Sequence, residues 1–226
     1  MTVPGTFDTS ARELIHAGLQ NLDEARSLFR QLSASGFDAA RCGLLLDALQ
    51  HVCDPDVALR NLVDIVNAQV SQGRALDDIM PDDTAFRQLV AVLGVSDAMG
   101  KLMRFRPDLV QAAATDHCNS HLYNHDQRRA HVLESVGADP NDRMSPTATM
   151  DLANAATALR RTYRNQLAAI IAQDTMSDDP IALQPRISSE LSDLADAALE
   201  GALAIARHEI TGSEHCRFAI IGMGKL

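Results

Sequence analysis

Apolar residues recur every three or four positions along most of the chain, and this spacing predicts helices rather than strands. The pattern is regular between residues 10 and 114, where short apolar runs alternate with Ser, Asp, Pro and Gly. These four residue types favour the starts and ends of helices. The first half of the chain is therefore predicted to be an irregular array of short helices, which must gain their stability by packing on each other.

Each predicted helix has its own start and stop signal. Ser10 and Glu13 form a capping box before one helical run from Leu14 to Leu32, which we expect to end at Gly36. Further starts are expected at Asp38, at Asp54-Pro55, at Asp83, at Ser96 and at Pro107, with Gly73 and Gly94 as stops.

The second half begins with a polar, His-rich segment, residues 115–146, which predicts a connection with one short helix. Ser145-Pro146 is expected to cap a long helix that continues to about Asp174, and residues 176–185 are expected to form a linker. A second long helix is predicted from Ser188 to Glu209. Its expected buried stripe is made of Leu191, Leu194, Ala195, Ala198, Leu199, Ala202, Leu203 and Ala206.

Residues 218–221, Phe-Ala-Ile-Ile, are the one segment that reads better as a strand. Since one strand cannot form a sheet, its partners must come from elsewhere. The predicted fold is mainly α, an irregular multi-helix array that leads into the first β-strand and glycine turn of an α+β domain. The expected divisions are a helical region at 1–114, the connection at 115–146, paired helices at 147–212 and a further domain starting at 213–226.

Composition narrows the class of protein. The 226 residues carry 30 acidic and 20 basic side chains, a net charge of −10. This balance argues against a general nucleic-acid binder or a protein of anionic membrane surfaces. No apolar run reaches the length of a membrane span, no signal peptide is visible, and a cytoplasmic location is expected. Cys42, Cys53, Cys118 and Cys216 form no zinc pattern and are interpreted as reduced, mostly buried thiols.

The end of the chain carries the first candidate site. Gly222 and Gly224 follow the predicted strand, and Lys225 comes next. Glycines there allow backbone amides to approach phosphate oxygens, and a lysine adds positive charge. The full phosphate-loop pattern is missing, so the segment taken alone favours an ordinary strand and turn over a phosphate site.

Three other clusters have an ordinary structural explanation beside a functional one. His117, His121 and His125 would share one face of a helix and could bind a metal, but their neighbours favour a solvated loop. The segment from His208 to His215 lacks the second histidine of a zinc protease, because Gly212 stands in its place. A third cluster, Arg160, Arg161 and Arg164, could clamp an acidic partner or a phosphate, or simply be a solvated face.

Three segments together resemble the glutamine synthetase adenylyltransferase family, in a version similar to those of actinobacteria. Residues 89–110 are similar to a short capped helix of that family and the Arg, Pro, Asp and Leu that follow it. Residues 158–174 and 187–206 look like the paired helices before its first catalytic domain, and residues 218–226 look like that domain's first strand and turn. The order and spacing of the three segments make the resemblance specific.

The resemblance implies a nucleotidyltransferase domain that starts after residue 215 and is truncated here. In that family the glycine turn, here Gly222 and Gly224, holds nucleotide phosphates, and Lys225 would have a supporting role. An Asp-x-Asp pair would hold Mg²⁺ for ATP or ADP chemistry, including phosphorolytic removal of AMP from glutamine synthetase. The 226 residues have no counterpart of that pair, so the resemblance implies metal ligands and catalytic residues outside this chain, which we expect to be inactive alone.

Two further interpretations stay open beside this one. The helices could form a docking module for glutamine synthetase or a PII-type regulatory protein, without any catalysis. The match at the end of the chain could also be a coincidence in an unrelated helical protein.

Overall fold

The computed structural model describes residues 9–79, 82–114, 123–177, 179–210 and 212, and within these ranges the structure is helical with no strand. The prediction of a mainly α chain is confirmed, while the predicted strand at 218–221 lies outside the described residues. The chain divides into two compact units, residues 1–118 with 171–177 and residues 119–170 with 178–226. None of the described helices is long and apolar enough to cross a bilayer.

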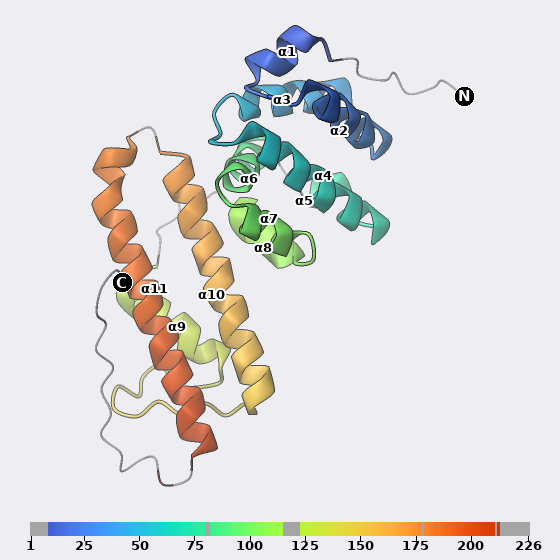
Figure 1. Ribbon diagram of the computed structural model, residues 1–226. Coiled ribbons are helices and arrows are strands. Elements are labelled where there is room, and N and C mark those ends of the chain that lie inside the picture. The colour runs from blue at the N-terminus through green and yellow to red at the C-terminus, as the bar shows by residue number, and fades with distance from the viewer. Residues whose placement is uncertain (1–8, 80–81, 115–122, 178, 211, 213–226) are drawn as a thin grey trace. The chain divides into compact units, whose positions relative to one another are not determined.

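The first unit carries the short helices (Figure 1). They are α1 (Ala11–His16), α2 (Leu22–Ala34), α3 (Ala39–Leu49), α4 (Pro55–Ser71), α5 (Leu76–Ile79), α6 (Asp83–Val95), α7 (Asp97–Met103) and α8 (Pro107–Ala114). Helix α4 packs against α2, α6 and α7, and α6 packs in turn against α3 and α8. The shared core is mostly apolar, and Leu45, Leu59, Leu62, Leu89 and Leu93 are among its largest fully buried side chains.

Most of the predicted caps of this unit are present. The Ser10–Glu13 capping box is formed at α1, and Asp38 and Asp54 accept backbone N–H bonds at the starts of α3 and α4. Ser96 does the same at the start of α7. Each of these contacts joins residues three apart in the chain, which is why the sequence alone could predict them.

The single helix predicted from Leu14 to Leu32 was wrong, because the chain breaks into α1 and α2. Gly18 adopts a positive φ of 81°, which ends α1. The free amides that follow are satisfied from a distance: the Asp56 carboxylate accepts bonds from Gln20 N at 3.0 Å and Asn21 N at 3.3 Å. Asp56 lies in the first turn of α4, so the break depends on a contact that helical periodicity does not reveal.

The end predicted at Gly94 is one residue early, since α6 continues through it to Val95. A Cβ at this position would lie 2.9 Å from Cβ of Val52. Gly94 therefore serves close packing between segments and not the end of a helix.

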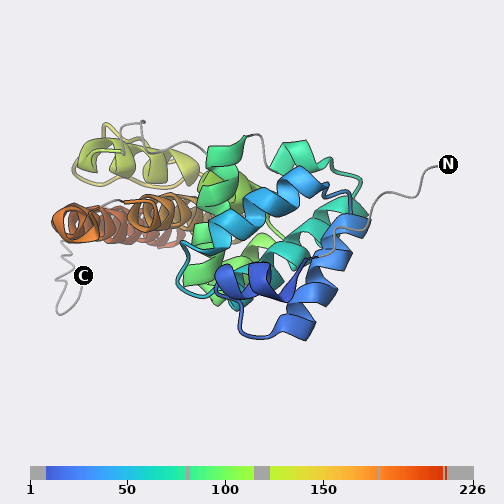
Figure 2. The ribbon, with the colours of Figure 1, turned by 90° about the horizontal axis from the view of Figure 1, so that it is seen from above.

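The second unit is built from α9 (His125–Ser135), α10 (Leu152–Thr175) and α11 (Pro180–Glu209). Helices α10 and α11 run antiparallel, and α9 packs against α11 on one side of this pair (Figures 1 and 2). One apolar cluster joins Leu133, Ala155, Ala204 and Ile205. A second cluster, Ile170, Ile187 and Leu194, joins the other halves of α10 and α11.

The predicted start of each long helix was wrong. Helix α10 starts at Leu152, six residues after Pro146, and α11 starts at Pro180, inside the predicted linker. The linker was inferred from its two prolines. Pro180 stands in the first turn, where no backbone donor is needed, and Asp179 caps that turn by accepting from Ala182 N. Only Pro185, inside the helix, removes a backbone donor that the helix would use.

The predicted buried stripe of α11 was only partly right. Leu194 is buried, but Leu191 is 41% exposed. The buried face instead consists of Ile187, Glu190, Leu194, Ala197, Gly201, Ala204 and Ile205. This face contains a charged residue and a glycine, so an apolar periodicity could not identify it.

Candidate functional site

The residues proposed from the sequence as a phosphate site, Gly222, Gly224 and Lys225, lie outside the described residues. His117 and His121 lie outside them too, whereas His125 is the exposed first residue of α9. Within the ranges that the structure describes, no three or more His, Cys, Asp or Glu side chains are grouped as a metal site would require. The histidine cluster stays a prediction, because His117 and His121 lie outside those ranges.

The structure describes only some of the remaining sequence candidates. His208 is exposed near the end of α11, and Gly212 has a positive φ of 81°. Of the cysteines, Cys42 is buried and Cys53 is exposed, while Cys118 and Cys216 lie outside the described residues. Burial raises the pKa of the Cys42 thiol, which keeps it protonated and unreactive.

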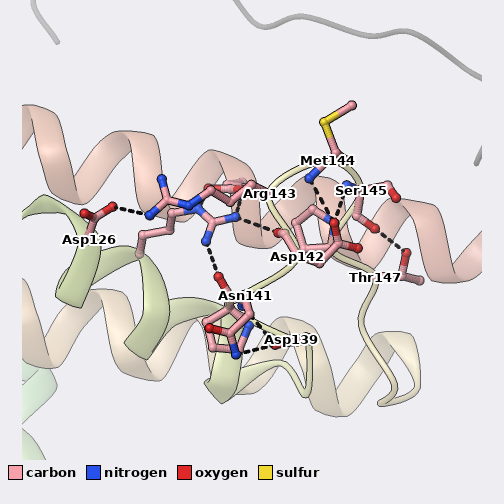
Figure 3. A network of polar contacts seen from close by, with 12 residues as sticks. Asp126, Asp139, Asn141, Asp142, Arg143, Met144, Ser145 and Thr147 are labelled. Carbon is pink, nitrogen blue, oxygen red and sulfur yellow. Dashed lines mark hydrogen bonds and ion pairs between the residues drawn. The ribbon is translucent and has the colours of Figure 1, made fainter.

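The most elaborate polar arrangement surrounds the loop between α9 and α10, residues 136–151 (Figure 3). Arg129 of α9 clamps this loop to α11. Its Nε and Nη2 donate to the two carboxylate oxygens of Glu200, at 2.7 and 2.6 Å. Its Nη1 and Nη2 also donate to the carbonyl oxygens of Pro140 and Asp142, at 2.6 and 2.9 Å. One guanidinium thus fixes α9, α11 and the loop together.

Aspartates fold the loop locally. The Asp142 carboxylate accepts bonds from Met144 N and Ser145 N, both at 2.9 Å, and Asp139 accepts one from Asn141 N (Figure 3). The hydrogen bonds from the backbone N–H groups of Ser145 and Met144 lower the pKa of Asp142. The loop therefore keeps its shape at neutral pH through its own ionised side chains.

The end of the loop is tied to α11 as well. Ala148 N donates to Ala204 O at 3.0 Å, and Arg207 Nη1 donates to Pro146 O at 3.1 Å. Gly137 has a positive φ of 75°, and its carbonyl accepts a bond from Thr149 Oγ1. The polar segment that the sequence predicts as a connection is, over its described residues 123–146, an integral part of the second unit.

Arg128, next to Arg129, lies in the interior of the second unit with only 1% of its surface exposed. It pairs with Glu190 of α11 and donates through Nη1 to Gln166 Oε1 of α10 at 2.7 Å. Gln166 in turn contacts His131 Nδ1 at 3.3 Å. A buried guanidinium therefore connects all three helices of the unit.

The structure also places the arginine cluster of α10. Arg160 and Arg161 are exposed, and Arg164 is partly exposed. Helical spacing puts them on a different face from Ala155, Gln166 and Ile170, which are among the residues through which α10 packs into its unit. We name Arg160, Arg161 and Arg164 the arginine face of α10.

The buried and clamped arginines hold the helices and the loop in place, and the exposed ones can bind a partner. The contacts of the described residues include no nucleophile paired with a base. The sequence reasoning missed Arg128, Arg129, Glu190 and Glu200. One signal could have found part of this set: Glu190 stands three residues after Ile187 and four before Leu194, at helical spacing with the buried residues. A charge in such a position requires a buried partner of opposite sign.

Comparison with known proteins identifies a family and several relatives that the chain resembles. A protein-family model described as glutamate-ammonia ligase adenylyltransferase matches residues 86–226. The chain is 66% identical over 220 residues to the bifunctional glutamine synthetase adenylyltransferase/adenylyl-removing enzyme of Bifidobacterium longum (strain NCC 2705). That match covers 97% of this chain and 20% of the relative.

More distant relatives carry the same name. The protein of Streptomyces avermitilis is 31% identical over 231 residues, covering 100% of this chain and 21% of the relative. That of Cutibacterium acnes is 29% identical over 214 residues, covering 94% of this chain and 21% of the relative. The chain thus spans about a fifth of the length of these relatives. No solved structure matches it.

Proposed function

The chain belongs to the glutamate-ammonia ligase adenylyltransferase family, and we propose that it is the N-terminal part of an enzyme that adds AMP to glutamine synthetase and removes it again. The observation that carries this proposal is the 66% identity over 97% of the chain to a bifunctional enzyme of that name. In this proposal, as in the resemblance above, AMP is added from ATP and removed by phosphorolysis, and both reactions control nitrogen metabolism in the cytoplasm.

Within that enzyme we assign this chain a positioning and docking role. Its described residues provide interlocked helices and no group of side chains suited to a metal ion. They therefore do not fit the Mg²⁺ that nucleotidyl transfer requires, and we place the metal and its ligands elsewhere in the longer protein. Gly222, Gly224 and Lys225 stay candidates for contact with nucleotide phosphates where this chain enters the first catalytic domain.

A phosphorolysis assay tests the catalytic half of this proposal. Purified chain 1–226 is mixed with adenylylated glutamine synthetase, phosphate and Mg²⁺, and release of ADP is followed, with the full-length enzyme as the positive control. We expect turnover by the full-length enzyme and none by the chain. Turnover by the chain would contradict its assignment as a non-catalytic part, and inactivity of the full-length enzyme would contradict the function itself.

A binding measurement tests the proposed docking role of the chain. Chain 1–226 is passed over immobilised glutamine synthetase and, separately, over a PII-type regulatory protein. Saturable binding to glutamine synthetase is the expected result, because the paired helices present a rigid surface before the catalytic domain. Saturable binding to the regulator alone would move the docking role to regulation.

A further inference from the structure

We propose that the arginine face of α10 is a docking surface for a carboxylate-bearing protein surface, and that this acidic surface belongs to glutamine synthetase. The proposal rests on the proposed function, which supplies the partner. The cationic character of the docking surface is argued from the residues of the second unit.

The spacing of the three arginines makes a compact cationic patch. Arg160 and Arg164 are one helical turn apart, and Arg161 is adjacent to Arg160. A turn of α-helix rises by about 5.4 Å, so the guanidinium groups of Arg160 and Arg164 can reach one or two carboxylates on a neighbouring helix or loop. Asp174, ten residues beyond Arg164, is the one acidic residue of α10.

Arg160 and Arg164 differ from five other arginines of the unit. Those five hold the unit together, through the pairs Arg128–Glu190, Arg129–Glu200, Arg143–Asp126 and Arg186–Glu190 and the bond from Arg207 to Pro146 O. Arg160 and Arg164 make no ion pair with any residue that the structure describes. Like charges one turn apart also disfavour a helix, so these two residues bring no evident benefit to the stability of the unit.

Arginine is suited to recognising carboxylates. Its planar guanidinium donates two parallel N–H bonds to one carboxylate, and arginine is enriched among the residues that dominate protein interfaces. The net charge of −10 over the whole chain opposes a nucleic-acid partner, whose phosphate backbone needs a broad basic surface. A small cationic patch on an acidic protein therefore favours a local acidic patch on another protein.

The test measures the affinity of chain 1–226 for immobilised glutamine synthetase by surface plasmon resonance. The variant Arg160→Glu/Arg164→Glu changes the net charge from −10 to −14, because each substitution contributes −2. Its matched control is Arg12→Glu/Arg74→Glu, which makes the same change at two exposed positions of the first unit. A third variant, Arg160→Gln/Arg164→Gln, removes the charge without reversing it, and circular dichroism confirms that each variant is folded.

We expect the Glu variant to bind about tenfold or more weakly, the Gln variant to lie between, and the control to stay within about twofold of the unmodified chain. The affinity of the unmodified chain should fall as NaCl rises, and that of the Glu variant should change less. Equal weakening by the control would show an effect of net charge alone and overturn the proposal, as would unchanged binding by the Glu variant.

Two further results separate the sources of failure. If the unmodified chain does not bind glutamine synthetase, the docking surface is overturned, while the phosphorolysis assay with full-length enzyme still decides the proposed function. If a single-stranded RNA of about 20 nucleotides binds through Arg160 and Arg164 and glutamine synthetase does not, the partner class is wrong.

Discussion

Among the described residues, the buried side chains of the first unit are uncharged and mostly apolar, whereas in the second unit arginines and glutamates lie among the apolar side chains between the helices. Leu59, Leu62 and Leu89 are fully buried at the centre of the first unit. In the second, Arg128 is just as buried and is paired with Glu190. Aliphatic packing is non-directional, while a buried ion pair requires one particular arrangement of its helices. The second unit should therefore respond to charge changes that the first would not feel.

The largest expected effect comes from breaking the buried pair. Glu190→Ala leaves Arg128 buried without a counter-charge and should lower the free energy of unfolding of the second unit by about 3–5 kcal/mol. Leu59→Ala in the first unit should cost about 2–5 kcal/mol by leaving a cavity. Because the chain has no tryptophan, urea unfolding is followed by circular dichroism, and hydrogen exchange shows which unit opens.

A double substitution distinguishes the two kinds of core. Arg128→Met/Glu190→Leu removes both charges and should recover most of the stability lost in Glu190→Ala, since apolar replacements of buried pairs are often neutral. A double variant as unstable as the single one would show that the geometry of the pair, and not its desolvation, is what the unit requires.

The next largest difference between the units is expected when a glycine is replaced where two helices pack closely. A Cβ on Gly201 of α11 would lie 2.8 Å from Val132 Cγ1 and 3.0 Å from Leu159 Cδ1, so Gly201→Ala should cost about 1–3 kcal/mol. The matched control is Gly43 of α3, where a Cβ meets nothing within 4 Å. Gly43→Ala should stabilise by about 0.5–1 kcal/mol through helix propensity. Thermal unfolding of both variants would show opposite shifts, and shifts of the same sign would contradict the packing assigned to Gly201.

Replacing a helix cap should lower the free energy of unfolding by the same amount in both units. Asp54 accepts from Val57 N at 3.0 Å in the first unit, and Asp179 accepts from Ala182 N at 3.0 Å in the second. Replacing either by Ala should cost about 1 kcal/mol, because a cap is a local contact that does not depend on the core. Urea unfolding of the two variants measures both costs, and a markedly larger loss at Asp179 would show that α11 depends on its cap beyond local geometry.

The smallest expected effect is the pH dependence that Asp142 contributes to the stability of the second unit. The folded state lowers the pKa of Asp142 from its ordinary value of 3.8, so its ionised form stabilises the loop above that pH. This contribution should be lost as the pH falls below 3.8 towards the lower folded value. The difference in stability between the unmodified chain and Asp142→Asn should therefore be constant from pH 7 to about 5 and shrink below about 4. A difference that grows on acidification would contradict this sign.

Some residues of the candidate site could be identified from the sequence alone, and others could not. The arginine face of α10 could be found from the sequence because its three arginines are neighbours along one helix. The clamp of Arg129 on Glu200 could not, since the two residues are 71 positions apart and nothing local links them. Residues 136–146 of the loop were predicted as part of a connection for the same reason: their composition is polar, and they are held in place by contacts with α9 and α11.

The sequence by itself determined the helical class, the caps at Ser10, Asp38, Asp54 and Ser96, and the family. These depend on contacts within one turn or on residue order, which the chain carries locally. The tertiary structure decided the break at Gly18, the buried face of α11 and the pairing of Arg128 with Glu190. In each case the residue that makes the deciding contact lies far away in the sequence. Polarity alone would predict that Arg128 and Glu190 are exposed, whereas their pairing allows both to be buried.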